Sequence, residues 1–305
     1  MAEKYLSLLK KCELCPRRCG VNRLQDKGFC GGGRFARVAL VSLHPWEEPV
    51  IAGPEQAAGT VFFSHCNLRC VFCQNHEISQ EGKGEDVTEE RLAEIFLEQQ
   101  VRGAATLDLV TPTHYVPQIL TALALAREKG FSLPVVYNSN GYENPEILEK
   151  LRGIVQVFLP DFKYFAAETA VKYSAAPAYP EIAKAAIRKM AEVAGPPVIK
   201  DGVMQRGVLV RHLVLPGRRH ESMEIVKWLY ENFGSKIYLS LMNQYTPLYR
   251  AAEYKEINRR LTTFEYESVV SYGADLGLEQ CFVQEKGTAS QNYVPSFDGS
   301  NVQRK

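Results

Sequence analysis

Residues 60–80 read TVFFSHCNLRCVFCQNHEISQ, and three cysteines in this stretch follow the spacing C-x3-C-x2-C: Cys66, Cys70 and Cys73. They come after a β-branched and aromatic run, residues 60–63, which predicts a buried strand. Three thiols on one loop can converge on one metal centre. A cubane iron–sulfur cluster normally takes four Cys thiolates, so three leave one iron open for a ligand. The alternatives are three structural cysteines, or a zinc site that His65 or His76 completes.

The composition is that of an ordinary globular protein. The 305 residues are 46% hydrophobic and 23% charged, with a formal net charge of +1. This length suits one large domain plus an appendage, and the near-neutral charge makes nucleic acid an unlikely main partner. No apolar run is long enough for a membrane span, and the N-terminus lacks the features of a signal peptide. We therefore expect a cytoplasmic protein whose cysteines bind metals rather than form disulfides.

A second group of cysteines lies near the N-terminus, in KCELCPRRCGVNRLQDKGFCGGG. Its members are Cys12, Cys15, Cys19 and Cys30. Four thiolates can close a structural zinc site or hold a second iron–sulfur cluster, and the spacing does not choose between them. The segment is also basic, so a zinc knuckle that binds nucleic acid is the alternative to a charged surface around a structural metal.

After the Cys66 loop, the pattern alternates between strands and helices. The expected strands are 105–110, 134–138, 154–160, 208–215 and 236–242, and the expected helices are 88–103, 116–129, the segments from 145, 166, 180 and 249, 220–233 and the segment from 263. With the strand before the cysteines this makes six β/α units, which predicts a parallel sheet with right-handed crossovers. Glu47 and Glu48, after an earlier strand from residue 35, are expected near the pocket entrance or in strand-end packing.

Polar motifs follow five of the expected strands. They are TPTHY at 111–115, NSNG at 138–141, PDFK at 160–163, RHLVLPG at 211–217 and NQY at 243–245. In parallel α/β folds, ligands collect at the carboxyl ends of the strands. Asp161 and Lys163 point the same way on an extended chain, and Arg211 needs an anion if it is buried. The alternatives are a surface ion pair for the first two, a turn at Asn140 and a rim position for Tyr245.

The Cys66 loop, with Phe72 beside its last cysteine, resembles the cluster loop of the radical S-adenosylmethionine (SAM) enzymes. The wider stretch from EEPVIAG to CVFCQNHEIS resembles the branch close to the pyruvate formate-lyase activating enzymes. The resemblance implies a partial (β/α)6 TIM-like barrel with a small Cys-rich N-terminal appendage. It also implies that a [4Fe-4S] cluster on the three loop cysteines binds SAM and cleaves it reductively to a 5′-deoxyadenosyl radical, which abstracts a hydrogen atom.

The same resemblance assigns cofactor-binding roles at the strand ends. NSNG resembles the Asp-Thr-Asn-Gly segment of the activating enzymes, with Asn138 in place of Asp, and PDFK resembles their Asp-x-Lys. RHLVLPG resembles their Arg-x-x-x-x-Pro-Gly segment, whereas TPTHY departs from the usual Gly-Gly-Glu-like segment. The activating enzymes have a His near the position of NQY, and Gln244 and Tyr245 here can still hydrogen-bond ribose or adenine. The expected cofactor-binding residues are Phe72, Thr111, Asn138, Asn140, Asp161, Lys163, Arg211 and Tyr245.

The predicted protein is a radical SAM enzyme with a metal-binding appendage at 1–40, a barrel at 41–285 and an irregular tail at 286–305. The resemblance implies a protein or peptide substrate, with a glycine Cα of a glycyl-radical enzyme as the favoured target. A peptide-modifying, methylating or small-molecule radical enzyme is equally compatible. It also implies a flavodoxin- or ferredoxin-like electron donor. The alternative from another class is a zinc-knuckle module that binds nucleic acid, fused to an aldolase-like barrel.

Overall fold

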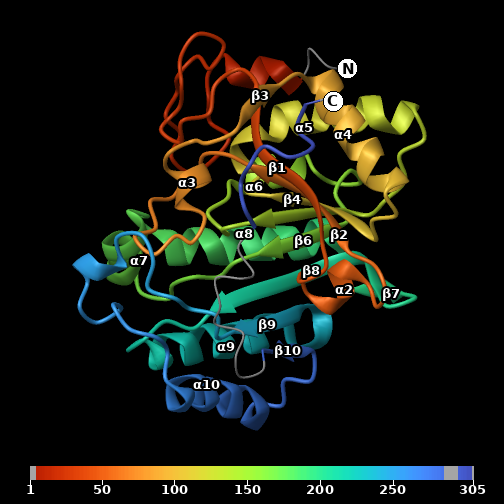
Figure 1. The fold of residues 1–305 in the computed structure, drawn as a ribbon. Coiled ribbons are helices and arrows are strands. Elements are labelled where there is room, and N and C mark those ends of the chain that lie inside the picture. Colours follow the sequence, from red (N-terminus) through yellow and green to blue (C-terminus); the bar gives the residue numbers. More distant parts are fainter. Residues whose placement is uncertain (1–4, 285–294, 304–305) are drawn as a thin grey trace.

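The computed structural model describes residues 5–284 and 295–303, and these form a mixed α/β fold around one sheet (Figure 1). The parallel strands at its centre are, in spatial order, β2 (Ala58–Phe63), β4 (Thr106–Val110), β5 (Val135–Ser139), β6 (Val157–Pro160), β8 (Val203–Leu213) and β9 (Tyr238–Met242). The described strands thus confirm the predicted α/β class with a parallel sheet, consistent with a partial TIM-like barrel.

Further strands extend the sheet. They are β1 (Ala36–His44), antiparallel to β2; β3 (Glu85–Val87), antiparallel to β1; β7 (Val198–Lys200), antiparallel to β8; and β10 (Cys281–Val283), parallel to β9. The sheet runs from β10 at one end to β3 at the other, so the barrel is open. The boundary predicted at residue 40 falls inside β1. The three-residue strands escaped prediction because they are too short to show a periodic pattern.

Helices follow the parallel strands. They are α2 (Pro49–Ala52), α3 (His76–Ser79), α4 (Glu89–Val101), α5 (Val116–Glu128), α6 (Pro145–Glu149), α7 (Ala167–Ser174), α8 (Tyr179–Ala194), α9 (Arg219–Phe233) and α10 (Thr263–Asp275), with 3-10 turns η1 (Ser7–Leu9), η2 (Thr113–Tyr115), η3 (Gly234–Lys236) and η4 (Ala251–Glu253). Thr88 caps α4 by accepting from the Arg91 amide at 3.2 Å, and Asn144 caps α6 by accepting from the Glu146 amide at 3.1 Å. These side-chain oxygens satisfy amides that the helix itself leaves free.

The helix predicted from Tyr249 is wrong. Only the 3-10 turn η4 forms there, because Tyr249 has a φ of +56°, in the left-handed region that helices do not use. The Tyr249 ring stacks instead on His76, with centroids 4.7 Å apart and planes 11° from parallel.

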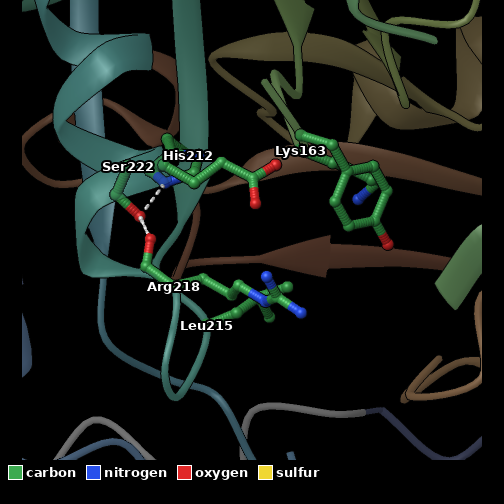
Figure 2. A pocket seen from close by; sticks show the side chains of 7 residues that line it. Lys163, His212, Leu215, Arg218 and Ser222 are labelled. Carbon is green, nitrogen blue, oxygen red and sulfur yellow. Dashed lines mark hydrogen bonds between the residues drawn. The ribbon is translucent and has the colours of Figure 1, made fainter. Parts of the chain in front are cut away.

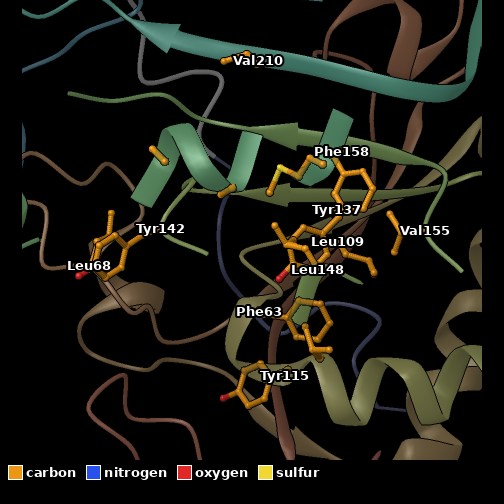
Figure 3. Packing of buried hydrophobic residues seen from close by; sticks show 14 of the residues in the cluster. Phe63, Leu68, Leu109, Tyr115, Tyr137, Tyr142, Leu148, Val155, Phe158 and Val210 are labelled. Carbon is orange, nitrogen blue, oxygen red and sulfur yellow. The ribbon is translucent and has the colours of Figure 1, made fainter. Parts of the chain in front are cut away.

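The core lies between the sheet and its helices (Figure 3). All six residues of β2 are buried, as expected for a strand covered on both faces. Phe63 on β2 packs on Tyr115, with ring centroids 5.7 Å apart, and Tyr137 on β5 packs on Phe158 on β6 at 5.9 Å. Each such side chain contributes about 1.5–3 kcal/mol when fully buried. This core fixes the strands whose carboxyl ends carry the polar motifs.

Two segments outside the barrel pack on it. In the N-terminal one, the buried Arg23 donates to the backbone oxygens of His114 and Gly33, which ties the appendage to η2. In the C-terminal one, residues 295–303, the Gly299 amide donates to Ala39 O at 3.1 Å on β1. Residues 286–294 and 304–305 of the predicted tail lie outside the described residues. Among the residues described, we find no helix with the length and apolar character needed to cross a membrane.

Candidate active site

The loop that carries Cys66, Cys70 and Cys73 leaves the carboxyl end of β2 and is pinned by backbone hydrogen bonds to the end of α7. The Arg69 amide donates to Ser174 O at 3.0 Å, and the Val71 amide donates to Tyr173 O at 2.8 Å. These contacts join residues more than a hundred positions apart, so tertiary packing rather than local sequence fixes the loop.

Each of the three loop sulfurs has a polar hydrogen-bonding neighbour. The pairs are Asn140 Nδ2 to Cys66 Sγ at 3.3 Å, Ser174 Oγ to Cys70 Sγ at 2.9 Å, and Ser79 Oγ with Cys73 Sγ at 3.3 Å. Such groups can donate to a thiolate and tune a bound centre. Only Asn140 was expected here; the two serines were missed because no motif marks them.

The loop thiols can act as metal ligands only in their thiolate form. Burial raises the pKa of the Cys66 thiol to about 12 and that of the Cys73 thiol to about 11, so the charge of a bound metal must hold them as thiolates. Among the described residues, no three His, Cys, Asp or Glu side chains gather as ligands of one ion. A cluster on the three loop cysteines therefore stays a prediction at this point. His76 is engaged with Glu81 at 3.0 Å.

Four predicted residues from adjacent strand ends meet directly. Arg211 Nε donates to Asp161 Oδ1 at 3.1 Å, and Arg211 Nη2 donates to Asn138 Oδ1 at 2.5 Å. Lys163 Nζ donates to the other oxygen of Asp161 at 2.6 Å. Burial raises the pKa of the Cys70 thiol, and the charge of Lys163 opposes part of this rise. The hydrogen bonds of Tyr179 and Asn140 connect this network to Cys66.

The network continues into an acidic group on its other side. Asn138 Nδ2 donates to Asp108 Oδ2 at 3.2 Å, and Glu47 Oε2 lies 3.6 Å from Arg211 Nη1. Burial raises the pKa of Asp108 to about 7, and burial, Asp108 and Glu48 together raise that of Glu47. Asp108 was missed, although a carboxylate inside the apolar strand TLDLV is a usable signal, since buried charges need partners.

Asn140 and Tyr179 join this network to the cysteine loop. Asn140 Nδ2 donates to Asn67 Oδ1 at 2.7 Å as well as to Cys66. The Tyr179 hydroxyl lies 2.8 Å from Asn140 O and 3.0 Å from Asp161 O, and the Lys163 amide donates to that hydroxyl at 3.0 Å. The turn at Asn140 is thus hydrogen-bonded to the cysteine loop and, through Tyr179, connected to the segment of Asp161 and Lys163.

The aromatic pair at the loop is Phe72 and Tyr245, whose ring centroids lie 5.6 Å apart. Both side chains are buried, and the Tyr245 hydroxyl donates to Ile257 O at 2.8 Å. Tyr245 therefore reaches the site through its ring and not through its hydroxyl, which differs from the hydrogen bond to ribose or adenine that the sequence suggested.

The segment after β4 points in two directions. Thr111 has a φ of +61°, a strained conformation for a β-branched residue, and its amide donates to Asn138 O at 2.9 Å. Thr113 instead donates to the buried Glu143 at 2.5 Å, and His114 contacts Ser64 O at 2.9 Å. Among TPTHY, Thr111 is the residue that the structure brings to the strand-end network.

His212 follows Arg211 on β8 but points to the opposite face, as alternation along a strand requires. Its Nδ1 lies 2.7 Å from Phe162 O. Its Nε2 lies 2.8 Å from Ser222 Oγ (Figure 2). The small hollow drawn there is lined by Lys163, His212, Arg218 and Ser222, among others. Since both His212 nitrogens have partners, this histidine has a structural role.

The four N-terminal cysteines are neighbours but are not gathered around one point. A Cβ atom at Gly28 would lie 3.5 Å from both Cys19 Sγ and Cys30 Sγ, so these sulfurs are at most twice that distance apart. After burial, which dominates, the charges of Cys30 and Cys12 also raise the pKa of Cys15. Among the described residues no three of these side chains gather as ligands of one ion, and the second metal centre stays a prediction.

Comparison with known proteins identifies the family. The model of the radical SAM superfamily matches residues 60–229, more than half of the chain. The uncharacterized protein MJ0674 of Methanocaldococcus jannaschii is 31% identical over 283 residues, which cover 90% of this chain and 77% of that protein. A second uncharacterized protein of that organism, MJ0808, is 26% identical over 157 residues, which cover 46% of each chain.

Solved structures agree on the fold. The crystal structure of Streptococcus suis SuiB bound to S-adenosylmethionine superposes with a TM-score of 0.50 at 14% identity, over 73% of this chain and 48% of SuiB. The chain thus spans about half the length of SuiB. At this identity the likeness concerns the fold alone. Together with the sequence matches, it leads to one conclusion: the chain belongs to the radical SAM superfamily.

Proposed function

We propose that this protein uses Cys66, Cys70 and Cys73 to hold a [4Fe-4S] cluster and the adjacent strand ends to hold SAM. One observation carries the proposal: Tyr179 and Asn140 connect the Asn138–Arg211–Asp161–Lys163 network to Cys66, and each of the three loop sulfurs has a polar hydrogen-bonding neighbour. When bound, the cluster supplies the electron that cleaves SAM to methionine and a 5′-deoxyadenosyl radical.

The protein's own residues bind and orient the cofactor. Arg211 and Lys163 hold Asp161 ionised, because their charges lower its pKa against the effect of burial. Ionised Asp161 and the amide of Asn138 can accept from ribose hydroxyls, and the two cations can bind a carboxylate. The Phe72 and Tyr245 rings offer an apolar wall, and Thr111 and Asn140 fix the turns at the rim. These are the roles we assign to the predicted cofactor residues.

For the substrate, we propose a protein or peptide from which the radical abstracts a glycine Cα hydrogen. The support is the resemblance of NSNG and PDFK to segments of the activating enzymes, together with the contact between these segments through Arg211.

We also propose a reducing flavodoxin- or ferredoxin-like electron donor, a metal centre on Cys12, Cys15, Cys19 and Cys30, and a cytoplasmic location. The proposed division of the chain is an appendage at 1–40, a barrel at 41–285 and a tail at 286–305. The radical SAM family match favours this function over the aldolase-like alternative.

The test is Cys70→Ala in anaerobically reconstituted protein with SAM and dithionite. We expect the variant to lose 5′-deoxyadenosine formation, measured by liquid chromatography and mass spectrometry. Cys281→Ala is the matched control, since Cys281 lies on β10. Undiminished product from the Cys70 variant would contradict the proposal.

The substrate class has a separate test. A peptide containing α,α-dideuterated glycine is incubated with the reconstituted protein and SAM. Deuterium in the 5′-deoxyadenosine is expected if a glycine Cα is the target. Product without deuterium would leave the radical chemistry standing and overturn the glycine assignment.

A further inference from the structure

Two arginines hold the backbone of the cysteine loop by its carbonyl oxygens. Arg69 Nη1 donates to Cys66 O at 2.7 Å and to Leu68 O at 2.9 Å. Arg17, from the appendage, donates from Nε to Asn67 O at 3.0 Å. Three consecutive carbonyls of the loop are therefore bound by guanidinium groups.

The same two arginines share one aromatic side chain from the appendage. The Arg17 guanidinium lies 4.3 Å from the centre of the Phe29 ring, and that of Arg69 lies 4.5 Å from it. Arg69 Nη2 also donates to the backbone oxygen of Phe29. In the described part of the chain neither arginine forms an ion pair, and both are held by Phe29 and the loop carbonyls. Arg17 also donates from Nη2 to Ala175 O at 2.5 Å and lies 5.3 Å from the centre of the Tyr142 ring.

The turn that presents Phe29 makes a second contact with the loop. Gly28 and Gly32 close the turn through an amide-to-oxygen bond of 3.0 Å, and Gly31 adopts a φ of +97°. His65, the residue before Cys66, lies against Gly31: a Cβ atom there would be 2.6 Å from His65 Nδ1. The appendage thus touches the loop on both sides of Phe29.

We propose that the appendage turn of residues 28–32 is a positioning device for the loop that bears Cys66 and Cys70. Phe29 fixes the planes of Arg17 and Arg69, and these hold the loop carbonyls. The proposal rests on the proposed function for the role of the loop as the cluster-binding segment. The contacts between the appendage and the loop do not depend on that function. Phe29 remains 44% exposed, so its ring contributes more to orienting the arginines than to burying apolar surface.

The physical reason is the geometry of the guanidinium group. Its planar fork reaches two carbonyls at once, as Arg69 does, which an ammonium group cannot do with the same fixed directions. An aromatic face on a guanidinium limits its rotation and adds attraction. Removing the ring would take away the aromatic face that limits the rotation of both arginines, so the donors to the loop carbonyls would be held less firmly.

The test is amide hydrogen exchange in the cluster-free full chain. The reporters are the Arg69 and Val71 amides, which donate to Ser174 O and Tyr173 O. We expect Phe29→Ala to speed their exchange roughly 5- to 30-fold, the effect of losing two cation–π contacts. Phe35→Ala is the matched control: Phe35 is 42% exposed beneath the Arg34 guanidinium at 4.9 Å, but Arg34 pairs with Glu89.

Unchanged exchange in Phe29→Ala, or an equal increase in Phe35→Ala, overturns the proposal. If Phe29→Ala does not fold, Phe29→Leu decides by the same measurement, because it keeps apolar bulk and removes the aromatic face. Arg69→Lys should also speed exchange of the Val71 amide, since lysine keeps the positive charge but not the planar guanidinium group. Unchanged exchange in this variant would contradict the proposed positioning role. Because these experiments use cluster-free protein, they stand even if reconstituted protein forms no 5′-deoxyadenosine.

A readout in reconstituted protein tests the consequence for the site. Phe29→Ala should alter the electron paramagnetic resonance line shape of the dithionite-reduced cluster, whereas Phe35→Ala should leave the wild-type spectrum. A spectrum of Phe29→Ala identical to wild type would overturn the claim that this turn positions the cysteines.

Discussion

Arg211 donates from Nε to Asp161 Oδ1 at 3.1 Å, although 50 residues separate the two in sequence. The contact exists because β6 and β8 are neighbours, and the two residues form a parallel bridge just beyond the end of β6. Lys163 occupies the other oxygen of Asp161. Burial alone would raise the pKa of Asp161, but Lys163 and Arg211 lower it, so the carboxylate stays ionised at neutral pH.

Arg211→Ala should weaken SAM binding by about 1.5–3 kcal/mol, the range for a hydrogen bond to a charged group. Isothermal titration with SAM under anaerobic conditions measures the affinity, and iron and sulfide analysis should show the cluster retained. Arg206→Ala is the control, since Arg206 lies on the same strand but is exposed. Wild-type affinity in Arg211→Ala would remove this residue from the cofactor site.

Cys15→Ala should lower the metal content of the appendage without removing the cluster on the Cys66 loop. Burial raises the pKa of the Cys15 thiol to about 12, so a metal must displace a firmly held proton, and binding should strengthen as pH rises. Zinc and iron are measured by mass spectrometry of purified protein, with Cys281→Ala as control. Equal metal content in the two variants would argue against a centre at the four N-terminal cysteines.

Gly31→Ala should destabilise the protein by about 1–3 kcal/mol. Gly31 needs a φ of +97°, and the added methyl group would lie 2.6 Å from His65 Nδ1. Gly33→Ala should change stability by less than about 0.5 kcal/mol, because its methyl group would meet only Lys27 Cγ at 3.9 Å. Urea unfolding followed by circular dichroism measures both; equal stabilities would show that the turn tolerates a Cβ at either position.

Glu143→Gln should flatten the pH dependence of stability. Burial raises the pKa of Glu143 from 4.5 to about 7. Between these values the folded protein keeps a proton that the unfolded chain has released, so stability falls as pH rises through this window and levels off above it. The variant removes this loss, which amounts to at most about 3 kcal/mol.

Urea unfolding between about pH 5 and about pH 8 measures the effect, because this range spans the raised pKa of Glu143. Glu146→Gln is the control, because its side chain is 77% exposed. A Glu143 variant whose stability falls with pH as steeply as that of the wild type would show that another group carries the dependence.

The order of strands and helices was predictable from the sequence. Hydrophobic periodicity reports which side of an element is buried, and this holds wherever the element lies. Caps such as Thr88 and Asn144 act within three residues, so their sequence signal survives folding. The three cysteines of the loop after β2 were equally visible, because their spacing is local.

The partners of the site residues were not predictable. Ser174 reaches Cys70 across 104 residues, and Arg17 reaches Asn67 across 50. Asp108 stood in an apolar strand as an unexplained charge, and only the neighbouring strand supplied Asn138 as its partner. Tyr245 was expected to offer a hydroxyl, but the packing of residues after β9 brings Ile257 O to that oxygen.

The sequence by itself determined the α/β order, the loop of three cysteines and the rim on which the polar residues would lie. Only the tertiary structure decided which side chains share a hydrogen bond, which of them face away, and how the appendage meets the loop through Phe29. The physical reason is that periodicity and spacing record local burial, whereas a hydrogen bond depends on the distance between atoms that only packing brings together.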